Sequence, residues 1–461
     1  MFQIFGINSS QHVHFIGIGG ISMSSLATIL KQQGFTVTGT DITRTHITDK
    51  LESLGIKIYI GHRAENISGA DLIVYTAAIK KDNPEYIAAQ NSNALCVERS
   101  VFLGELMRAY RCPCCISGTH GKTTTTSMVA LIMEQAQMDP TVLVGGEVKA
   151  LGGNLRIGNS DIFVTEACEY VESFLKFYPQ KAIILNVEAD HLDYFKDLNH
   201  IVRAFTKFAS LLPKDGDLIV NGMDQNAMRA ASNAACRIST FGIGESYDYC
   251  AKNIIFDSSG YGSYDLIAQG NKIAHIKLSV PGKHNILNSL AASALCHRLG
   301  VDGDRIAEGL SNFRGTDRRF EIKGEYNGVL IVDDYAHHPT EIKVTLETAK
   351  NYGHKKITAI FQSHTYTRTK ALLHEFADAF TLADKIIITD IFAAREKDTG
   401  LVHPTDLVNL LIENGKDAIY IGPFDDIVSY IQKNTAPGEM VITVGAGNIY
   451  EVGEKLVKSS Q

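Results

Sequence analysis

The chain of 461 residues is too long for one hydrophobic core, and roughly 100 to 200 residues per domain would give two to four domains, of which we expect three. Hydrophobic residues make up 45% of the sequence, charged residues make up 21%, and the net charge is -7. This mild acidity argues against a nucleic-acid-binding protein, which would present a basic face. No apolar run approaches the roughly 18 residues that span a bilayer, and no export signal is recognisable at the N-terminus. We therefore expect a cytoplasmic protein without membrane insertion.

The eight cysteines are scattered along the sequence, apart from the cluster Cys112, Cys114 and Cys115. None of them shows convincing zinc-ligand spacing with nearby histidines. In a reducing compartment, buried free thiols are the expected state. A redox or metal role for the cluster is the weaker alternative.

Three segments differ in their patterns of apolar residues. Residues 1–110 open with a strand, a helix and a strand, which predicts a Rossmann-like domain. Residues 111–315 begin with an apolar strand and predict a central domain with a mainly parallel sheet. Within it, short strands broken by Gly, Ser and Asn between about 237 and 281 predict a small antiparallel sheet. Residues 316–461 alternate strands and helices, which predicts a doubly wound Rossmann-like domain. The fold class is therefore α/β with three domains.

A glycine turn at residues 118–123, GTHGKT, lies between an apolar strand and an apolar-striped helix. Such a turn exposes backbone N–H groups and the positive end of the helix dipole, and Lys122 adds a full charge, so phosphate is the natural ligand. The Thr123 hydroxyl can bind a magnesium ion that bridges two phosphates. Ile116 stands where the common GxxxxGK[ST] pattern has its first glycine. A turn without a ligand is the alternative, and we predict a phosphate-binding loop.

Magnesium needs further oxygen ligands, which usually stand at the C-terminal ends of neighbouring strands. Glu166 ends one predicted strand, and Asp190 and His191 follow another. Each residue alone could simply cap a helix. Together with Lys122 they form a candidate metal cluster.

The first segment has its own glycine turn, where Gly17, Gly19 and Gly20 follow the strand at 12–16. Ser22 stands where the GxGxxG fingerprint has its last glycine. The turn therefore either binds a phosphate-bearing ligand or only packs the strand closely against the helix. Asp41 would contact a ribose or a base of that ligand, or it caps a turn.

Four polar residues crowd the end of an apolar strand in the third segment: Asp333, Asp334, His337 and His338. α/β sheets bind ligands at this edge, so we expect at least one of the four to belong to a site. Pro339 predicts that a helix begins directly after them. Arg368 follows the next strand and is a candidate clamp for a carboxylate, with a solvated helix cation as the alternative.

Taken together, these motifs resemble the Mur ligase family, and the resemblance covers nearly the whole chain. It rests on eight collinear motifs: HFIGIGGISMSSLA, GTHGKTTTT, TEACEYVESF, NVEADHLDYF, GKHNILN, FRGTDRRFE, VDDYAHHPTE and FQSHTYTRT. One such motif would be weak evidence, whereas eight in this order are specific. In that family the three domains bind a UDP sugar, ATP and the incoming amino acid, in chain order.

The resemblance also implies a role for individual residues. The UDP-sugar-binding residues would be Gly17, Ile18, Gly19, Gly20, Asp41, Thr76 and Ala77. The ATP-binding residues would be Gly118, Thr119, His120, Gly121, Lys122, Thr123, Thr124, His284, Asn285 and Asn288. The catalytic residues would be Lys122, Glu166, His191, Arg319 and Asp334, and the magnesium ligands would be Thr123, Glu166 and His191. The amino-acid-binding residues would be Tyr335, His337, His364 and Arg368.

Four positions depart from the usual family pattern. The family usually has Asp at Cys168, Gly at Ser22, Gly at Ala336 and Arg at Thr365. Without an arginine at Thr365, Arg368 would carry more of the carboxylate binding. Ser22 and Ala336 would only reshape turns.

Within this family, the motifs most resemble those of the members that add L-alanine. The resemblance therefore implies that L-alanine is ligated to the lactyl carboxylate of UDP-N-acetylmuramate through an acyl phosphate, giving ADP and phosphate. ATP and Mg²⁺ would be required, and the protein would be a monomer or a weak homodimer. A sister enzyme that ligates a preformed tripeptide to the same sugar is the nearest alternative, although TEACEYVESF and TYTRT favour a single small amino acid. A P-loop kinase or nucleotide switch would leave GKHNILN and DDYAHHPTE without a role. A catalytically inactive binding protein is disfavoured because Lys122, Thr123, Glu166 and His191 are all present.

Overall fold

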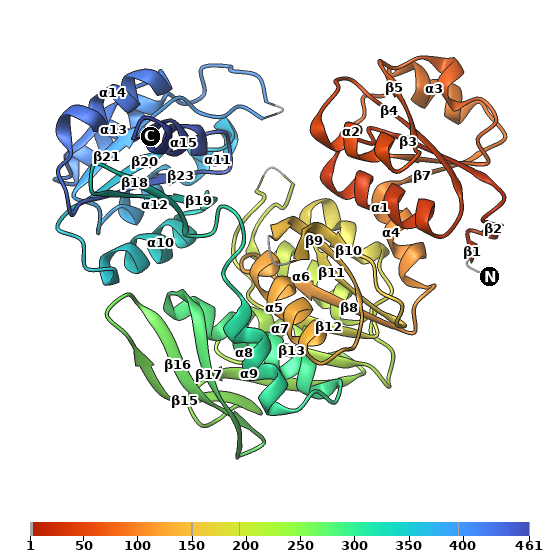
Figure 1. Cartoon of the computed structure of the whole chain (residues 1–461), viewed down its shortest axis with the longest axis horizontal. Helices are drawn as coiled ribbons and strands as arrows, with labels where there is room; N and C mark the ends of the chain where they lie inside the picture. Colours follow the sequence, from red (N-terminus) through yellow and green to blue (C-terminus); the bar gives the residue numbers. More distant parts are fainter. Residues whose placement is uncertain (1–2, 149–150, 193, 395, 461) are drawn as a thin grey trace. The chain divides into compact units, whose positions relative to one another are not determined.

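The structure is a computed structural model that describes residues 3–148, 151–192, 194–394 and 396–460. The chain forms two compact units (Figure 1). The first unit comprises Met1–Val187, Val202–Thr240 and Ala291–Val301, and the second comprises Glu188–Ile201, Phe241–Leu290 and Asp302–Gln461.

The first unit begins with a short hairpin and a five-stranded parallel sheet in the order β5-β4-β3-β6-β7. Its elements are β1 (Gln3–Ile4), β2 (Ile7–Asn8), β3 (His12–Ile16), α1 (Ile21–Gln32), β4 (Thr36–Asp41), α2 (His46–Ser53), β5 (Lys57–Ile60), η1 (Ala64–Ile67), β6 (Leu72–Tyr75), α3 (Pro84–Gln90), β7 (Leu95–Glu98) and α4 (Arg99–Met107). Met23, Leu26 and Leu30 of α1 are buried, as their helical spacing predicts. Gly34 follows α1 with a φ of +88°, which suits glycine after a helix.

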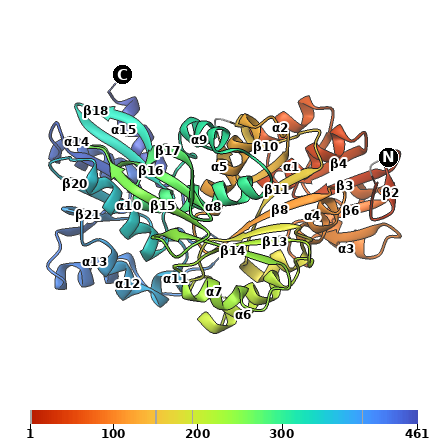
Figure 2. The same cartoon turned by 90° about the horizontal axis from the view of Figure 1, so that it is seen from below.

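The rest of the first unit is built on a mainly parallel sheet in the order β10-β9-β11-β8-β12-β13-β14. Its elements are β8 (Cys112–Ser117), α5 (Lys122–Gln135), β9 (Thr141–Val148), β10 (Gly153–Arg156), β11 (Ile162–Ala167), η3 (Tyr170–Lys176), β12 (Lys181–Ile184), α6 (Leu198–Ala209), β13 (Asp217–Asn221), α7 (Gln225–Ala231) and β14 (Arg237–Ile243). Figure 2 shows α5 on one side of these strands and α6 and α7 on the other. The apolar runs of β8, β11, β12 and β13 are almost entirely buried because helices cover both faces.

The last residues of β14 lie in the second unit, where they pair in parallel with β15. β15 (Tyr249–Phe256), β16 (Tyr261–Ala268) and β17 (Asn271–Pro281) then form an antiparallel extension, side by side in both views (Figures 1 and 2). This is the small antiparallel sheet that the turn residues between about 237 and 281 predict.

The remainder of the second unit is a six-stranded sheet in the order β18-β19-β23-β20-β21-β22. Helix α8 (Lys283–Arg298) begins in the second unit, and its residues from Ala291 onward belong to the first. The other elements are α9 (Gly303–Asn312), β18 (Glu321–Tyr326), β19 (Val329–Asp334), α10 (Pro339–Asn351), β20 (Ile357–Phe361), α11 (Tyr366–Ala371), α12 (Leu373–Ala379), β21 (Lys385–Ile388), α13 (Pro404–Glu413), β22 (Ala418–Tyr420), α14 (Phe424–Asn434), β23 (Met440–Val444) and α15 (Tyr450–Lys458). The α/β fold class predicted from the sequence is confirmed.

Two hydrophobic clusters cover the opposite faces of this six-stranded sheet. Along β20, Ala359 and Phe361 belong to one cluster, and Ile360 between them belongs to the other. The same alternation recurs in β21 and β23, since successive side chains of a strand point to opposite faces. The sheet is therefore covered on both sides, as a doubly wound domain requires.

Two local features are not evident from the sequence pattern. The segment after β20 forms two short helices: α11 ends at Ala371 and α12 begins at Leu373, because Leu372 between them leaves helical geometry with a φ of −117°. The antiparallel edge strand β18 was not expected, since Glu321–Tyr326 has charged residues and a glycine rather than an apolar run. Polar sequence is typical of an exposed edge strand.

Candidate active site

The glycine turn at 118–121 joins the buried strand β8 to helix α5, as the sequence predicts. Gly118 and Gly121 have φ of +144° and +83°, and a Cβ at Gly118 would lie 2.8 Å from Cβ of Leu185. The side chain of Asn186 braces the turn, because its Oδ1 accepts from the His120 N–H at 2.7 Å and its Nδ2 donates to the His120 carbonyl at 3.1 Å. The turn is thus shaped by backbone geometry that only glycine tolerates.

The start of α5 is suited to an anion. Gly121 is its N-cap, no side chain caps it, and its first turn holds no acidic residue. The N–H groups and the dipole of such a helix start attract phosphate.

Lys122 points its ammonium group back into the turn. Its Nζ donates to the carbonyls of Gly118 and Thr119 and lies 3.0 Å from Oε2 of Glu169, with the Lys122 side chain 14% exposed and that of Glu169 2% exposed. Burial by itself would lower the pKa of Lys122, but Glu169, with Cys168 and Glu166 beside it, outweighs burial and raises the pKa. The ammonium is therefore charged throughout the neutral range.

Strand β9 brings two predicted magnesium ligands to adjacent positions. The N–H of Gly145 donates to Oε1 of Glu166 at 2.6 Å. The neighbouring Gly146 lies against Thr123, since a Cβ built on Gly146 would be 3.5 Å from Cγ2 of Thr123. A carboxylate and a hydroxyl are the oxygen ligands that Mg²⁺ prefers, so these two residues fit that ion.

His191, the third predicted ligand, belongs to the second unit, where it adopts a φ of +53°. Its N–H donates to Oδ1 of Asp190 at 2.6 Å. Asp190 itself pairs with Arg368, whose Nη2 lies 3.0 Å from the same oxygen. Burial alone would raise the pKa of Asp190, but His191 and Arg368 hold it well below its usual range. Asp190 therefore anchors Arg368 in this structure.

Arg368 is not a solvated helix cation, because its side chain is 12% exposed and is held by Asp190. Its Nη1 also lies 3.3 Å from Nδ1 of His364, and the ring of His364 lies 6.0 Å from that of His337. Three of the four residues predicted to bind the amino acid therefore stand together. The fourth, Tyr335, contacts the ring of His337 edge-on at 5.4 Å.

Asp334 is buried at the end of β19 and accepts hydrogen bonds from the backbone N–H groups of Phe320 and Ala336 at 2.9 and 2.8 Å. Burial raises its pKa to about 6, against the lowering effect of Arg319. Arg319 also lies 3.5 Å from Glu341. The predicted pair of Arg319 and Asp334 is thus close enough to interact electrostatically.

The predicted adenine-binding residues stand at the start of α8. Asn285 donates to the Pro281 carbonyl at 2.7 Å and accepts from Asn288 at 3.2 Å, and both asparagines are buried. Nδ1 of His284 is buried without a hydrogen-bond partner among the described residues. Burial lowers the pKa of His284 to about 4, so its ring is neutral at pH 7. A neutral imidazole with an unused polar atom fits a bound base such as adenine.

In the N-terminal sheet, the turn at Gly17–Gly20 is held by Asp41. The N–H of Gly19 donates to Oδ2 of Asp41 at 2.8 Å, and a Cβ on Gly19 would lie 2.7 Å from the same atom. Asp41 therefore caps the turn in this structure. Thr76 contacts the same turn, since a Cβ on Gly17 would lie 2.9 Å from its Cγ2.

Four residues that shape these sites have no role predicted from the sequence: Gly145, Glu169, Asn186 and Arg318. Glu169 and Asn186 lie inside motifs of the resemblance, so their polarity at strand ends was the available signal. Arg318 bonds Asp333 at 3.0 Å and the carbonyls of Gly445 and Gly447. Asp333 is therefore structural. The cysteines of residues 112–115 are free thiols, with Cys114 and Cys115 buried, as expected.

Three family models match the chain in succession. The Mur ligase family catalytic domain matches residues 12–111, the Mur ligase middle domain matches residues 116–296, and the Mur ligase glutamate ligase domain matches residues 318–447. A UDP-N-acetylmuramate--L-alanine ligase from Caldanaerobacter subterraneus is 54% identical over 451 residues, which covers 98% of both proteins. The chain belongs to the Mur ligase family. The resemblance drawn from the eight motifs is thereby confirmed.

Solved Mur ligases share the fold along the whole chain. A UDP-N-acetylmuramate-alanine ligase from Thermotoga maritima has a TM-score of 0.81 and 30% identity, over 98% of this chain and 99% of its own. A murein peptide ligase from Psychrobacter arcticus has a TM-score of 0.72 and 27% identity, over 98% of each chain. The three-domain architecture of this Mur ligase is therefore the predicted one. None of its helices, within the described ranges, has the length and apolarity to cross a membrane.

We predict that Lys122→Ala reduces turnover by about 10²-fold or more, because it removes the charge at the phosphate turn. It should also lower the melting temperature, since removing one partner of a buried ion pair costs up to about 3–5 kcal/mol. The double variant Lys122→Ala/Glu169→Ala should recover stability but not activity. ADP release and thermal unfolding would be measured in parallel, and wild-type turnover in Lys122→Ala would contradict the assignment.

Gly145→Ala should raise the Mg²⁺ concentration needed for half-maximal activity by about tenfold, because a Cβ there would lie 2.8 Å from Oε2 of Glu166 and displace the carboxylate. Gly146→Ala is the matched control, since its Cβ meets only a methyl group at an ordinary 3.5 Å. Titration of activity with Mg²⁺ separates the two variants. Equal Mg²⁺ requirements would show that Glu166 does not bind the ion.

Proposed function

We propose that this Mur ligase joins L-alanine to the lactyl carboxylate of UDP-N-acetylmuramate, with ATP converted to ADP and phosphate, in peptidoglycan precursor synthesis in the cytoplasm. The observation that carries the proposal is the phosphate turn with Lys122, next to Thr123 and Glu166 on neighbouring elements. The 54% identity to a UDP-N-acetylmuramate--L-alanine ligase over nearly the whole chain supports the choice of substrates.

Each predicted segment has its own task in this proposal. Residues 1–110 bind the UDP sugar at the turn of Gly17–Gly20, residues 111–315 bind ATP, and residues 316–461 bind the amino acid. Mg²⁺ held by Thr123, Glu166 and His191 would neutralise charge on the phosphates of ATP. The protein acts as a monomer or a weak homodimer.

The first chemical step is attack of the lactyl carboxylate on the γ phosphate of ATP, which gives an acyl phosphate and ADP. Lys122 stabilises the charge that develops on the transferred phosphoryl group, because its ammonium is protonated and held at the helix start. Glu169 releases part of its hold on Lys122 when phosphate enters, since both anions compete for one ammonium. Asn186 keeps the turn in shape meanwhile.

The second step is attack of the amine of L-alanine on the acyl carbon, and phosphate leaves from a tetrahedral intermediate. Arg368, fixed by Asp190, binds the carboxylate of the amino acid with its remaining N–H donors. His337 has a pKa lowered to about 4, by burial first, so its ring is neutral and lies beside His364 within the same group. Arg319 and Asp334 act on the ATP side of this domain.

The alternative acceptor is a preformed tripeptide, and its observational support is the likeness to a murein peptide ligase. The motifs TEACEYVESF and TYTRT, together with the 54% identity to a UDP-N-acetylmuramate--L-alanine ligase, favour the single amino acid. The two acceptors are distinguished by experiment.

ADP release from purified protein with Mg²⁺, ATP and UDP-N-acetylmuramate tests the proposal, with L-alanine, glycine, L-serine and the stem tripeptide supplied in parallel. We expect release that requires both the UDP sugar and L-alanine. ADP release with the tripeptide alone would show that the protein is a tripeptide ligase. Release that is indifferent to the UDP sugar would leave only a nucleotide hydrolase.

Arg368→Ala should raise the KM for L-alanine by at least about tenfold and leave the KM for ATP within about twofold, because L-alanine is the only substrate that the guanidinium binds in this proposal. Arg298→Ala is the matched control, since it breaks a comparable pair with Asp217 in the first unit. That control should lower the melting temperature without changing the KM for L-alanine. An unchanged KM for L-alanine in Arg368→Ala would show that another residue of this domain binds the carboxylate of L-alanine.

A further inference from the structure

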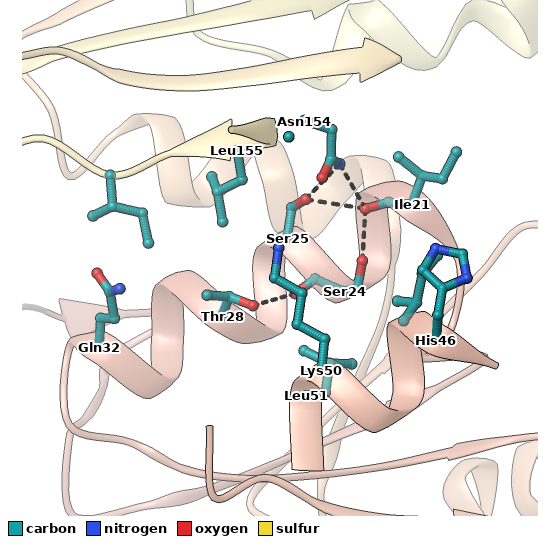
Figure 3. A pocket seen from close by; sticks show the side chains of 13 residues that line it. Ile21, Ser24, Ser25, Thr28, Gln32, His46, Lys50, Leu51, Asn154 and Leu155 are labelled. Carbon is teal, nitrogen blue, oxygen red and sulfur yellow. Dashed lines mark hydrogen bonds between the residues drawn. The ribbon is translucent and has the colours of Figure 1, made fainter. Parts of the chain in front are cut away.

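Asn154 links strand β10 to the first turn of helix α1. Its Nδ2 donates to the carbonyl of Ile21 at 3.1 Å and to Oγ of Ser25 at 2.8 Å (Figure 3). Both protons of the amide group are therefore used on α1. Asn154 lies 129 residues after Ser25 in the sequence, and both elements belong to the first unit.

The carbonyl of Ile21 accepts hydrogen bonds from several donors. The hydroxyls of Ser24 and Ser25 also donate to it, at 2.9 and 3.0 Å. Asn154, Ser25 and the Ile21 carbonyl thus form a closed triangle of hydrogen bonds, and Ser25 is buried. Ile21 is the first residue of α1 and directly follows Gly20, so this triangle fixes the helix at the glycine turn.

Strand β9, the other strand of this hairpin, contacts Glu166 through Gly145. Between the pairs Gly153↔Val148 and Leu155↔Leu143 the register of β9 and β10 shifts, so that the residues around Gly145 stand opposite Asn154. The pairing of β9 with β11 ends at Leu143. The N–H of Gly145 is therefore outside both ladders and donates to Glu166 instead. A bulge of this kind re-aims groups beside a site.

A cavity of about 270 Å³ lies beside Asn154, between α1, α2 and β10. Its lining includes Thr28 and Gln32 of α1, Lys50 of α2 and Leu155 of β10 (Figure 3). Side-chain packing is interrupted at this cavity, and the hydrogen bonds of Asn154 link the helix to the hairpin at its border.

We propose that Asn154 is a positioning residue for the diphosphate of the UDP sugar. The bulged hairpin contacts Glu166 through Gly145 and the start of α1 through Asn154. It therefore fixes the position of the glycine turn at Gly17–Gly20 relative to Glu166, the predicted magnesium ligand. A well-placed turn binds the diphosphate with its N–H groups, and a displaced turn loses part of that binding. The inference rests on the proposed function, because it assumes that this turn receives the UDP sugar.

The test compares Asn154→Leu, which keeps the shape and removes the hydrogen bonds, with Asn159→Ala. Asn159 is an amide of the following loop, and its backbone N–H and its side chain both donate to Asp139. Titration calorimetry would give the Kd of UDP-N-acetylmuramate and of Mg²⁺-ATP for each protein. We expect Asn154→Leu to raise the Kd of the UDP sugar about tenfold, with the Kd of ATP within about twofold, and Asn159→Ala to change neither.

Ser25→Ala provides a second route that leaves Asn154 in place. Because both residues belong to one triangle, the combined variant Asn154→Leu/Ser25→Ala should weaken UDP-sugar binding by much less than the product of the single effects. An unchanged Kd in Asn154→Leu and in Ser25→Ala would overturn the inference. Equal weakening of both ligands with a lower melting temperature would also overturn it, because the hairpin would then be merely structural. Absence of UDP-sugar binding by the unmodified protein would instead remove the proposed function.

Discussion

The position of one carboxylate, Glu166, depends on a backbone amide of a neighbouring strand. Gly145 can approach it only because glycine has no Cβ and because the bulge in β9 takes its N–H out of the sheet. Glu166 in turn stands at the end of β11, which pairs with β8 directly before the phosphate turn. The predicted magnesium site therefore follows from sheet register, and a change of register by one residue would turn Glu166 to the opposite face.

Two cations of the candidate active site are held in buried ion pairs. Lys122 pairs with Glu169, and Arg368 pairs with Asp190. Such pairs contribute little net stability, because desolvation offsets most of their attraction, but they fix the cations in place. A phosphate or a carboxylate that enters then meets a positioned donor, and little reorganisation is needed.

The order of motifs was readable from the sequence because each motif is local. The turn of residues 118–123 combines strand, glycines, lysine and hydroxyl within a few positions, and the helix start at Pro339 follows from one residue. The contacts that hold the site were not readable, since they join distant residues: Asn154 reaches back 133 residues to Ile21, and Arg368 reaches back 178 residues to Asp190. Only the three-dimensional register of β9, β10 and β11 reveals Gly145 as a partner of Glu166.

The proposed mechanism requires that the lactyl carboxylate itself attacks ATP. UDP-N-acetylmuramate labelled with oxygen-18 in that carboxylate would be turned over with ATP, Mg²⁺ and L-alanine, and the released phosphate would be analysed by mass spectrometry. An acyl phosphate requires one labelled oxygen to pass from the carboxylate to each phosphate released. Unlabelled phosphate formed together with ADP would contradict the account, because water and not the carboxylate would then have attacked ATP.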